Sequence, residues 1–251
     1  MSSVRAGRRS GFRRVRARAQ AAPPPKPSHS GLIREAIFGI NDGLVATIGL
    51  VSGEALSRQA HGSIVIAGCS AVGAAIVSMA VGSFLATASE NDFIRKEIAD
   101  QAQAIQEHPE RERRHVARLL DEMGVPDEAV PVLTRRIVRH RPRWLKFMAR
   151  EHLGIHENRT ESPITNALVM GFAVLAGSLP PLLPYLLPLP LALARNLSWA
   201  FSLGAAFALG AVKGRLTRTS LLKNALSFGV LVSLSAAVGA GIGVIFGAVG
   251  A

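Results

Sequence analysis

The sequence predicts an all-α integral membrane protein with five transmembrane helices and a soluble three-helix insert between the second and third spans. Two observations support this fold class. Hydrophobic residues make up 49% of the 251 residues and charged residues only 18%, which is more apolar than an ordinary soluble domain. The charges also gather in the first 30 residues and in the middle of the chain, so long segments on either side carry almost none. Such segments suit lipid as their solvent.

Residues 1–30 contain many arginines, four prolines and no acidic residue. This composition cannot bury a core, so we expect a disordered basic tail. Its charge fits a cytosolic tail under the positive-inside rule, and it also fits an organelle transit peptide. Because the tail supplies much of the net charge of +12, nucleic acid is not an expected partner.

Residues 31–90 hold the first two predicted transmembrane helices. The apolar runs at about 32–56 and 64–88 are each long enough to cross a bilayer, and the short link between them makes the pair antiparallel. Small residues recur every fourth position along the second run, as Ser70, Ala74, Ser78, Gly82 and Ala86. Such a stripe allows close helix approach in lipid. The single cysteine, Cys69, rules out a disulfide framework and a cysteine-based metal site;.

Residues 91–162 mix acidic and basic side chains with apolar residues at helical spacing, which predicts the soluble insert;. Turn-forming residues at 124–127 and 141–143 divide it into about three helices;. Residues 163–251 hold the last three spans, at about 164–187, 191–212 and 221–249. A second small-residue stripe on the last span, Ser235, Gly239, Gly243 and Gly247, predicts either packing within the chain or contact with another subunit;.

Basic residues near the ends of the spans predict the topology. The tail, the insert and the loop around 213–223 are basic, whereas the other two links are nearly uncharged. We therefore expect the N-terminus and the insert on the cytosolic side and the C-terminus on the opposite side.

Five short motifs resemble the vacuolar iron transporter family. They are REAIFGINDGLV at 34–45 in the first span, SMAVG at 78–82 in the second, KEIA at 96–99 after it, FMAREHLG at 147–154 closing the insert, and GSLPPLLPYL at 177–186 in the third span. The resemblance implies a homodimeric five-helix transporter with a cytosolic metal-binding insert. It would export Fe²⁺ or Mn²⁺ from the cytosol in exchange for protons, with no prosthetic group.

Asp42 is the candidate for the ion path on physical grounds as well. It lies about ten residues into the first span, where a carboxylate facing lipid is costly and therefore faces a cavity, a partner or an ion. Asn41 could add an amide oxygen. The alternative is a buried carboxylate hydrogen-bonded for packing.

Met79 is a second candidate, because it lies in the family signature of the second span. A methionine in an apolar helix usually fills space. Together, however, a carboxylate and a thioether disfavour Mg²⁺ and Ca²⁺ and accept Fe²⁺, Mn²⁺, Co²⁺ or Zn²⁺. Protons would compete for the same carboxylate.

The insert departs from the family pattern. The family's first Glu-x-x-Glu pair falls on Gln101 and Ala104, and Ser83 stands where relatives usually carry Glu. The resemblance assigns the remaining metal ligands of the insert to Glu112 and His115 and, on its last helix, to Met148 with Glu151 or His152. Acidic pairs at 97 and 100 and at 107 and 110 could substitute for the lost pair, or could simply be solvated and paired with arginines.

One alternative to a transporter is a membrane-anchored metal sensor or partner-docking protein that uses the insert. An enzyme is not expected, since no nucleophile with a base and no phosphate-binding loop stands out. A carboxylate within a span favours transport, because a sensor in the insert would not need one.

Overall fold

The computed structural model describes residues 30–57, 59–152, 154 and 162–249. The predicted tail at 1–29 lies outside them. Every helix or strand in the described residues is an α-helix, which confirms the all-α fold class. The order is α2 (Ser30–Leu56), α3 (His61–Glu107), α4 (Pro109–Glu122), α5 (Val130–Val138), α6 (Arg141–Glu151), α7 (Pro163–Leu186), α8 (Leu191–Leu216) and α9 (Leu221–Val249).

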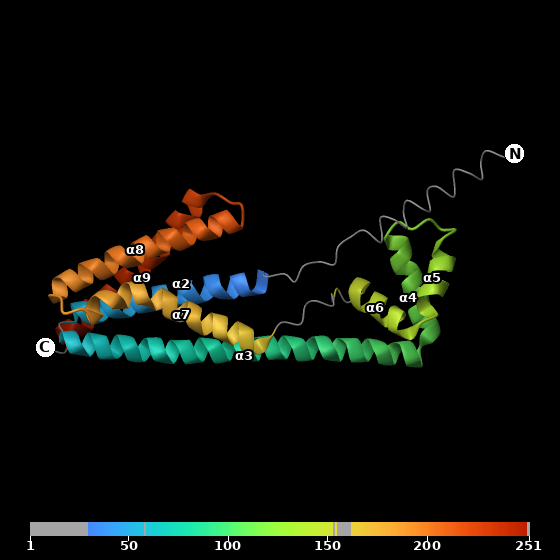
Figure 1. Ribbon diagram of the computed structural model, residues 1–251, viewed down its shortest axis with the longest axis horizontal. Coiled ribbons are helices and arrows are strands. Elements are labelled where there is room, and N and C mark those ends of the chain that lie inside the picture. Colours follow the sequence, from blue (N-terminus) through green and yellow to red (C-terminus); the bar gives the residue numbers. More distant parts are fainter. Residues whose placement is uncertain (1–29, 58, 153, 155–161, 250–251) are drawn as a thin grey trace.

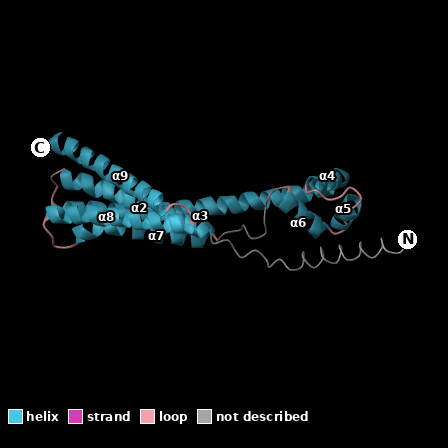
Figure 2. Cartoon of the chain, turned by 90° about the horizontal axis from the view of Figure 1, so that it is seen from above, coloured by secondary structure: helices cyan, strands magenta, loops and turns pink. Residues whose placement is uncertain are grey.

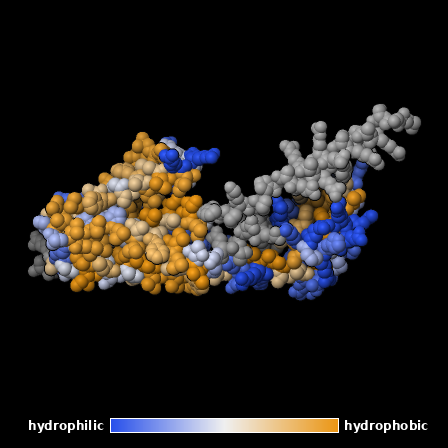
Figure 3. All heavy atoms as spheres, in the orientation of Figure 1, coloured by the Kyte–Doolittle hydropathy of each residue, from blue (hydrophilic) through white to orange (hydrophobic). Residues whose placement is uncertain are grey.

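Five helices in the described residues, α2, α3, α7, α8 and α9, are long and apolar enough to cross a membrane, as predicted. Large apolar side chains point outward from them, among them Phe172 on α7 and Val230 on α9, which are 70% and 66% exposed. In Figure 3 the hydrophobic surface covers these helices, and the hydrophilic surface gathers over α4 to α6. Such a surface suits lipid, and the protein is a multi-pass integral membrane protein.

The helix α3 is a single helix of 47 residues. At about 1.5 Å per residue it is roughly 70 Å long, well beyond a bilayer core of about 30 Å. No proline interrupts it, and the next one, Pro109, starts α4. The expected boundary between span and insert at residue 90 therefore falls inside one helix. Figures 1 and 2 show the bundle along one half of α3 and α4 to α6 at its other end.

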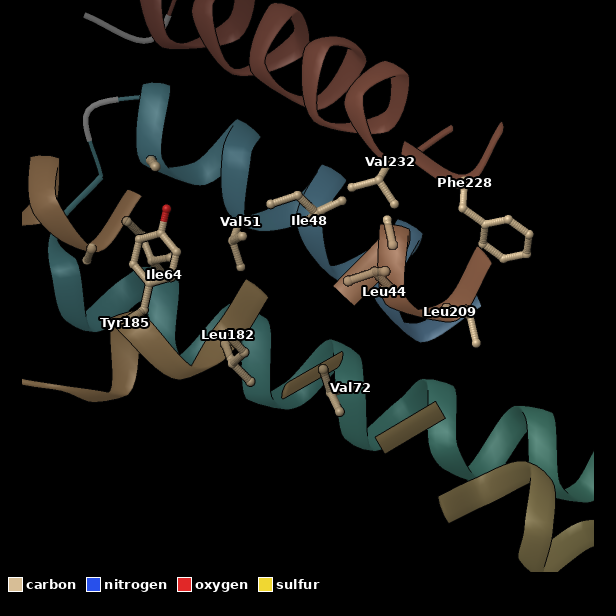
Figure 4. Packing of buried hydrophobic residues seen from close by; sticks show 13 residues of the cluster. Leu44, Ile48, Val51, Ile64, Val72, Leu182, Tyr185, Leu209, Phe228 and Val232 are labelled. Atoms are coloured by element: carbon tan, nitrogen blue, oxygen red, sulfur yellow. The ribbon is translucent and has the colours of Figure 1, made fainter. Parts of the chain in front are cut away.

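The helix α2 lies at the centre of the bundle and contacts α3, α7, α8 and α9. Its side chains Leu44, Ile48 and Val51 are fully buried. Figure 4 shows them between Leu182 of α7 and Val232 of α9. Polar contacts add to this packing, since the Trp199 Nε1 of α8 donates to Ser52 Oγ at 2.9 Å.

The two small-residue stripes have different environments. On α9, a Cβ added at Gly243 would meet the Gly53 carbonyl of α2, so this stripe packs within the chain. On α3, all five stripe residues, Ser70, Ala74, Ser78, Gly82 and Ala86, are exposed. Only the α3 stripe is open to a second molecule.

The insert has its own small core, formed by Ile105, Val116, Leu120, Trp144 and Met148. Ile105 belongs to the last turns of α3, so the insert is built directly on the extended end of that helix. We call the end of the bundle nearest the insert the insert end, and the opposite end the far end.

Candidate functional site

Asn41 and Asp42 lie near the middle of α2, and α7 fixes how this part of the helix is turned. A Cβ at Gly43 would meet the Val174 carbonyl, and one at Gly177 would meet the Ile40 carbonyl. Because both positions lack a side chain, the two backbones lie against each other at this level. The rotation of α2 around Asp42 is therefore set by backbone contact.

The polar groups of this segment are left without protein partners. Asn41 Oδ1 is buried and has no hydrogen-bond partner among the described residues. Asp42 is half-buried, and no ion pair of its carboxylate is present in the described part of the chain. A carboxylate in mid-span without a cationic partner needs a proton or a cation to balance it. The Asp42 carboxylate and the Asn41 amide oxygen are therefore the candidate ligands that this part of α2 offers to a metal ion.

Glu35 marks the same face of α2 nearer the insert end. Ser83 Oγ of α3 donates to Glu35 Oε2 at 3.1 Å, and the Glu35 side chain is only 13% exposed. Glu35 was not among the residues predicted from the sequence. Its spacing could have identified it, because residues seven apart lie on one face of a helix, and Glu35 precedes Asp42 by seven positions.

The Glu35–Ser83 bond also indicates where Met79 lies relative to Asp42. Met79 lies one turn from Ser83 along α3, and Asp42 lies two turns from Glu35 along the antiparallel α2. The step from Ser83 to Met79 and the step from Glu35 to Asp42 both run away from the insert end. Met79 and Asp42 therefore lie on the same sides of α3 and α2 as the two hydrogen-bonded residues. Met79 is half-buried, between the face on which Ile76 contacts α7 and the open stripe. The described residues contain no direct bond between Met79 and Asp42.

A separate pocket of about 320 Å³ lies in the insert. Its lining residues are Glu97, Asp100, Gln101, Ala104, Arg111, Glu112, His115 and His152. Gln101 Nε2 donates to Glu112 Oε2 at 2.8 Å, and both side chains are buried. The pocket is thus lined by Gln101 and Ala104, the two positions at which the family pattern has glutamates. Here they supply an amide and a methyl group in place of two carboxylates.

Two histidines meet at the same pocket. The His115 and His152 rings lie 4.1 Å apart, edge to face. Burial and the neighbouring His152 lower the pKa of His115 below its usual value, while Glu112 acts in the opposite direction. His115 therefore stays neutral to lower pH than an ordinary histidine, and a neutral ring nitrogen can bind a metal.

The other two predicted insert ligands lie elsewhere. Met148 is fully buried in the insert core, and Glu151 pairs with Arg150 at 3.3 Å. Neither lines the pocket. In the part of the chain that the structure describes, no three acidic, histidine or cysteine side chains are grouped closely enough to hold a metal ion. Of the five predicted insert ligands, Glu112, His115 and His152 line the same pocket, but they are not gathered around one point.

Comparisons with known proteins agree with the motifs. The sequence profile of the VIT family matches residues 33–244. The chain is 31% identical to vacuolar iron transporter 1 of Arabidopsis thaliana over 209 residues, which cover 82% of each protein. It is 29% identical to vacuolar iron transporter 2 of Oryza sativa subsp. japonica over 213 residues, 84% of this chain and 86% of the relative. Protein CCC1 of Saccharomyces cerevisiae is 26% identical over 157 residues, 61% of this chain and 48% of the relative.

Proposed function

The chain belongs to the VIT family, and from this premise we propose that it exports Fe²⁺, and Mn²⁺ with it, from the cytosol in exchange for protons. The relatives are named vacuolar iron transporters, which supports a membrane metal transporter rather than an enzyme. Iron is the ion that their names give. The transport of manganese, the direction of transport and the exchange for protons go beyond those names and are proposed here.

The observation that carries the proposal is the uncompensated carboxylate of Asp42 in mid-span, next to the unpartnered Asn41 Oδ1. Asp42 and Asn41 would supply hard oxygen ligands, and Met79 a soft thioether. This mixture favours borderline transition metals over Mg²⁺ and Ca²⁺. Because a proton and a metal ion bind the same carboxylate oxygens, release of one on binding of the other gives a physical basis for exchange.

The proposed orientation follows the distribution of charge. Basic residues of the loop after α8 and of the insert lie at the insert end, which we place on the cytosolic side. The C-terminus of α9 then lies on the opposite side. The open small-residue stripe of α3 supports a homodimer joined through the membrane spans;.

In the insert we propose a single weak metal site at Glu112, His115 and His152. Gln101 occupies one Glu112 oxygen, so an incoming ion would have to displace an existing hydrogen bond. Met148 and Glu151 could join only after the insert repacks, because one is in the core and the other is paired with Arg150.

Flux measurements in liposomes test the transport path. We expect wild-type protein to carry Fe²⁺, Mn²⁺ and Co²⁺ under an imposed pH gradient. Asp42→Asn, which keeps the shape of the side chain but not its charge, should reduce flux to background. Asp92→Asn is the matched control, because Asp92 is an exposed acid on α3. Undiminished flux in folded Asp42→Asn protein would refute the role of Asp42, and no flux in the wild type would refute transport itself.

A further inference from the structure

A second carboxylate of α2, Glu54, lines a pocket that the proposed function has not used. The pocket has a volume of about 510 Å³ and lies between α2 and α9. Glu54 lies two residues before the end of α2 at Leu56, so the pocket is at the far end of the bundle. Resting on the proposed function, we propose that this pocket is the far-end cation site of the transport path and that Glu54 is its charged ligand.

The Glu54 carboxylate is in a state that favours cation binding. Glu54 is half-buried, and the neighbouring wall residues include Leu50, Ile242 and Phe246. In the described part of the chain, its carboxylate oxygens make no hydrogen bond or ion pair; the Ser57 Oγ contact goes to the Glu54 backbone carbonyl. A carboxylate against such walls requires a proton or a cation.

The pocket also continues the part of α2 that carries Asp42. Gly49 and Gly53 line the pocket, and they follow Asp42 by seven and eleven residues, which places them on the Asp42 face of α2. Ala46, one turn beyond Asp42 on that face, is exposed. Glu35 and Asp42 thus lie on one face of α2. Farther along this face, Gly49 and Gly53 border the pocket where they pack against α9, and Glu54 is turned about 100° from Gly53;. Twelve residues separate Asp42 from Glu54, or roughly 18 Å along the helix.

The other oxygen atoms and the volume of the pocket also suit a hydrated cation. The hydroxyls of Ser57 and Ser235 line the same pocket, and each already donates its proton to a backbone carbonyl of α2. Their oxygens therefore remain available as acceptors beside the carboxylate. An all-oxygen site binds Mn²⁺ or Fe²⁺ without a soft ligand, and six waters occupy roughly 180 Å³ at liquid density. The pocket is large enough for an ion to regain its hydration shell there.

Sided flux measurements separate this site from the rest of the path. With Mn²⁺ supplied from the far side, Glu54→Gln should raise the half-saturating concentration about tenfold, the effect of one lost charge-assisted contact. The value for Mn²⁺ supplied from the insert side should change less than about twofold, and Glu54→Asp should restore most of the loss. Glu35→Gln is the matched variant at the other end of α2, and its effect should fall on the insert side. Unchanged kinetics from both sides in Glu54→Gln, with normal wild-type flux, would overturn the site while leaving the proposed function intact.

Labelling tests the pocket without relying on transport. In a Cys69→Ala background, Glu54→Cys should react with a membrane-impermeant cationic thiol reagent added on the far side, and Cd²⁺ should slow the reaction. Val230→Cys, on an outward-facing part of α9, is the control and should react only with lipid-soluble reagents. If Glu54→Cys also reacts only with lipid-soluble reagents, lipid fills the pocket and the inference is wrong.

Discussion

At the scale of single residues, the proposed metal site of the insert depends on Gln101. Its amide donates to Glu112 at 2.8 Å, so it satisfies the carboxylate that a metal would otherwise bind. Gln101→Glu would place two carboxylates at this distance. We expect lower thermal stability without metal, because like charges repel, and an affinity for Mn²⁺ or Co²⁺ about tenfold higher, because charged ligands set the affinity of such sites.

Calorimetry and thermal unfolding of the full-length protein in detergent, with and without metal, would measure both effects. Gln103→Glu is the control, because Gln103 lies on the same helix but is exposed and bonds Glu107. If Gln101→Glu and Gln103→Glu change metal binding equally, the pocket is not a metal site.

The pKa of His115 predicts how stability depends on pH. In the folded protein this pKa is lowered, chiefly by burial and by His152, so between the folded value and the ordinary value of about 6.5 the unfolded chain binds more protons. Folding stability should therefore fall as pH decreases through about 6.5. The measurement is the difference in melting temperature between pH 7.5 and 5.5 in the presence of a chelator. His115→Gln should reduce this difference and His108→Gln, at an exposed position, should not; equal behaviour of the two variants would contradict the prediction.

Some residues could be selected from the sequence and others could not. Asp42 could be, because a charge inside an apolar run is conspicuous whatever the packing. Glu35 and Glu54 lie close to the ends of the same run, where a charge resembles an ordinary span boundary. Met148 was predicted as an insert ligand from its register, but register fixes a position along a helix and not the neighbour it faces, and Met148 faces the core.

At the scale of helices, the five spans could be predicted closely because hydropathy and length determine them. The extent of α3 could not be. The change to polar residues at about position 90 indicates a change of solvent, and a helix continues through such a change when no proline or glycine stops it. The direct consequence is mechanical, since the insert is attached to the second span by continuous helix.

The α2–α9 contact gives a prediction about packing. A Cβ at Gly243 would meet the Gly53 carbonyl, whereas one at Gly241 would meet nothing within 4 Å. Gly243→Ala should destabilise the protein by about 1–3 kcal/mol, because the backbones must separate. Gly241→Ala should be neutral or stabilising by up to about 1 kcal/mol, since alanine is the better helix residue. Thermal unfolding of both variants in the same detergent measures the difference, and equal stabilities would mean that α9 does not pack on α2 in this way.

At the scale of the whole molecule, the exposed stripe of α3 is the candidate surface for contact with a second subunit. Its residues are small and exposed, and a Cβ at Gly73 or Gly82 would meet nothing within 4 Å. Small side chains leave lipid poorly packed against a helix but allow a second helix to approach closely. The equivalent stripe on α9 is already covered by α2, so a dimer built through the spans should use α3.

A two-fold axis along the membrane normal would bring each residue near the axis next to its own copy. In a Cys69→Ala background, Ser78→Cys should therefore form a disulfide-linked dimer in membranes under mild oxidation. Val230→Cys, which is equally lipid-facing but on α9 and 66% exposed, should remain monomeric on a non-reducing gel. Dilution with excess lipid before oxidation distinguishes a stable dimer from chance encounters between monomers, because only a stable dimer keeps its cross-linking yield. Equal cross-linking of the two variants, or loss of the Ser78→Cys product on dilution, would place the dimer contact elsewhere or show that the protein is a monomer. The path along Asp42 would then have to form without help from a partner across α3.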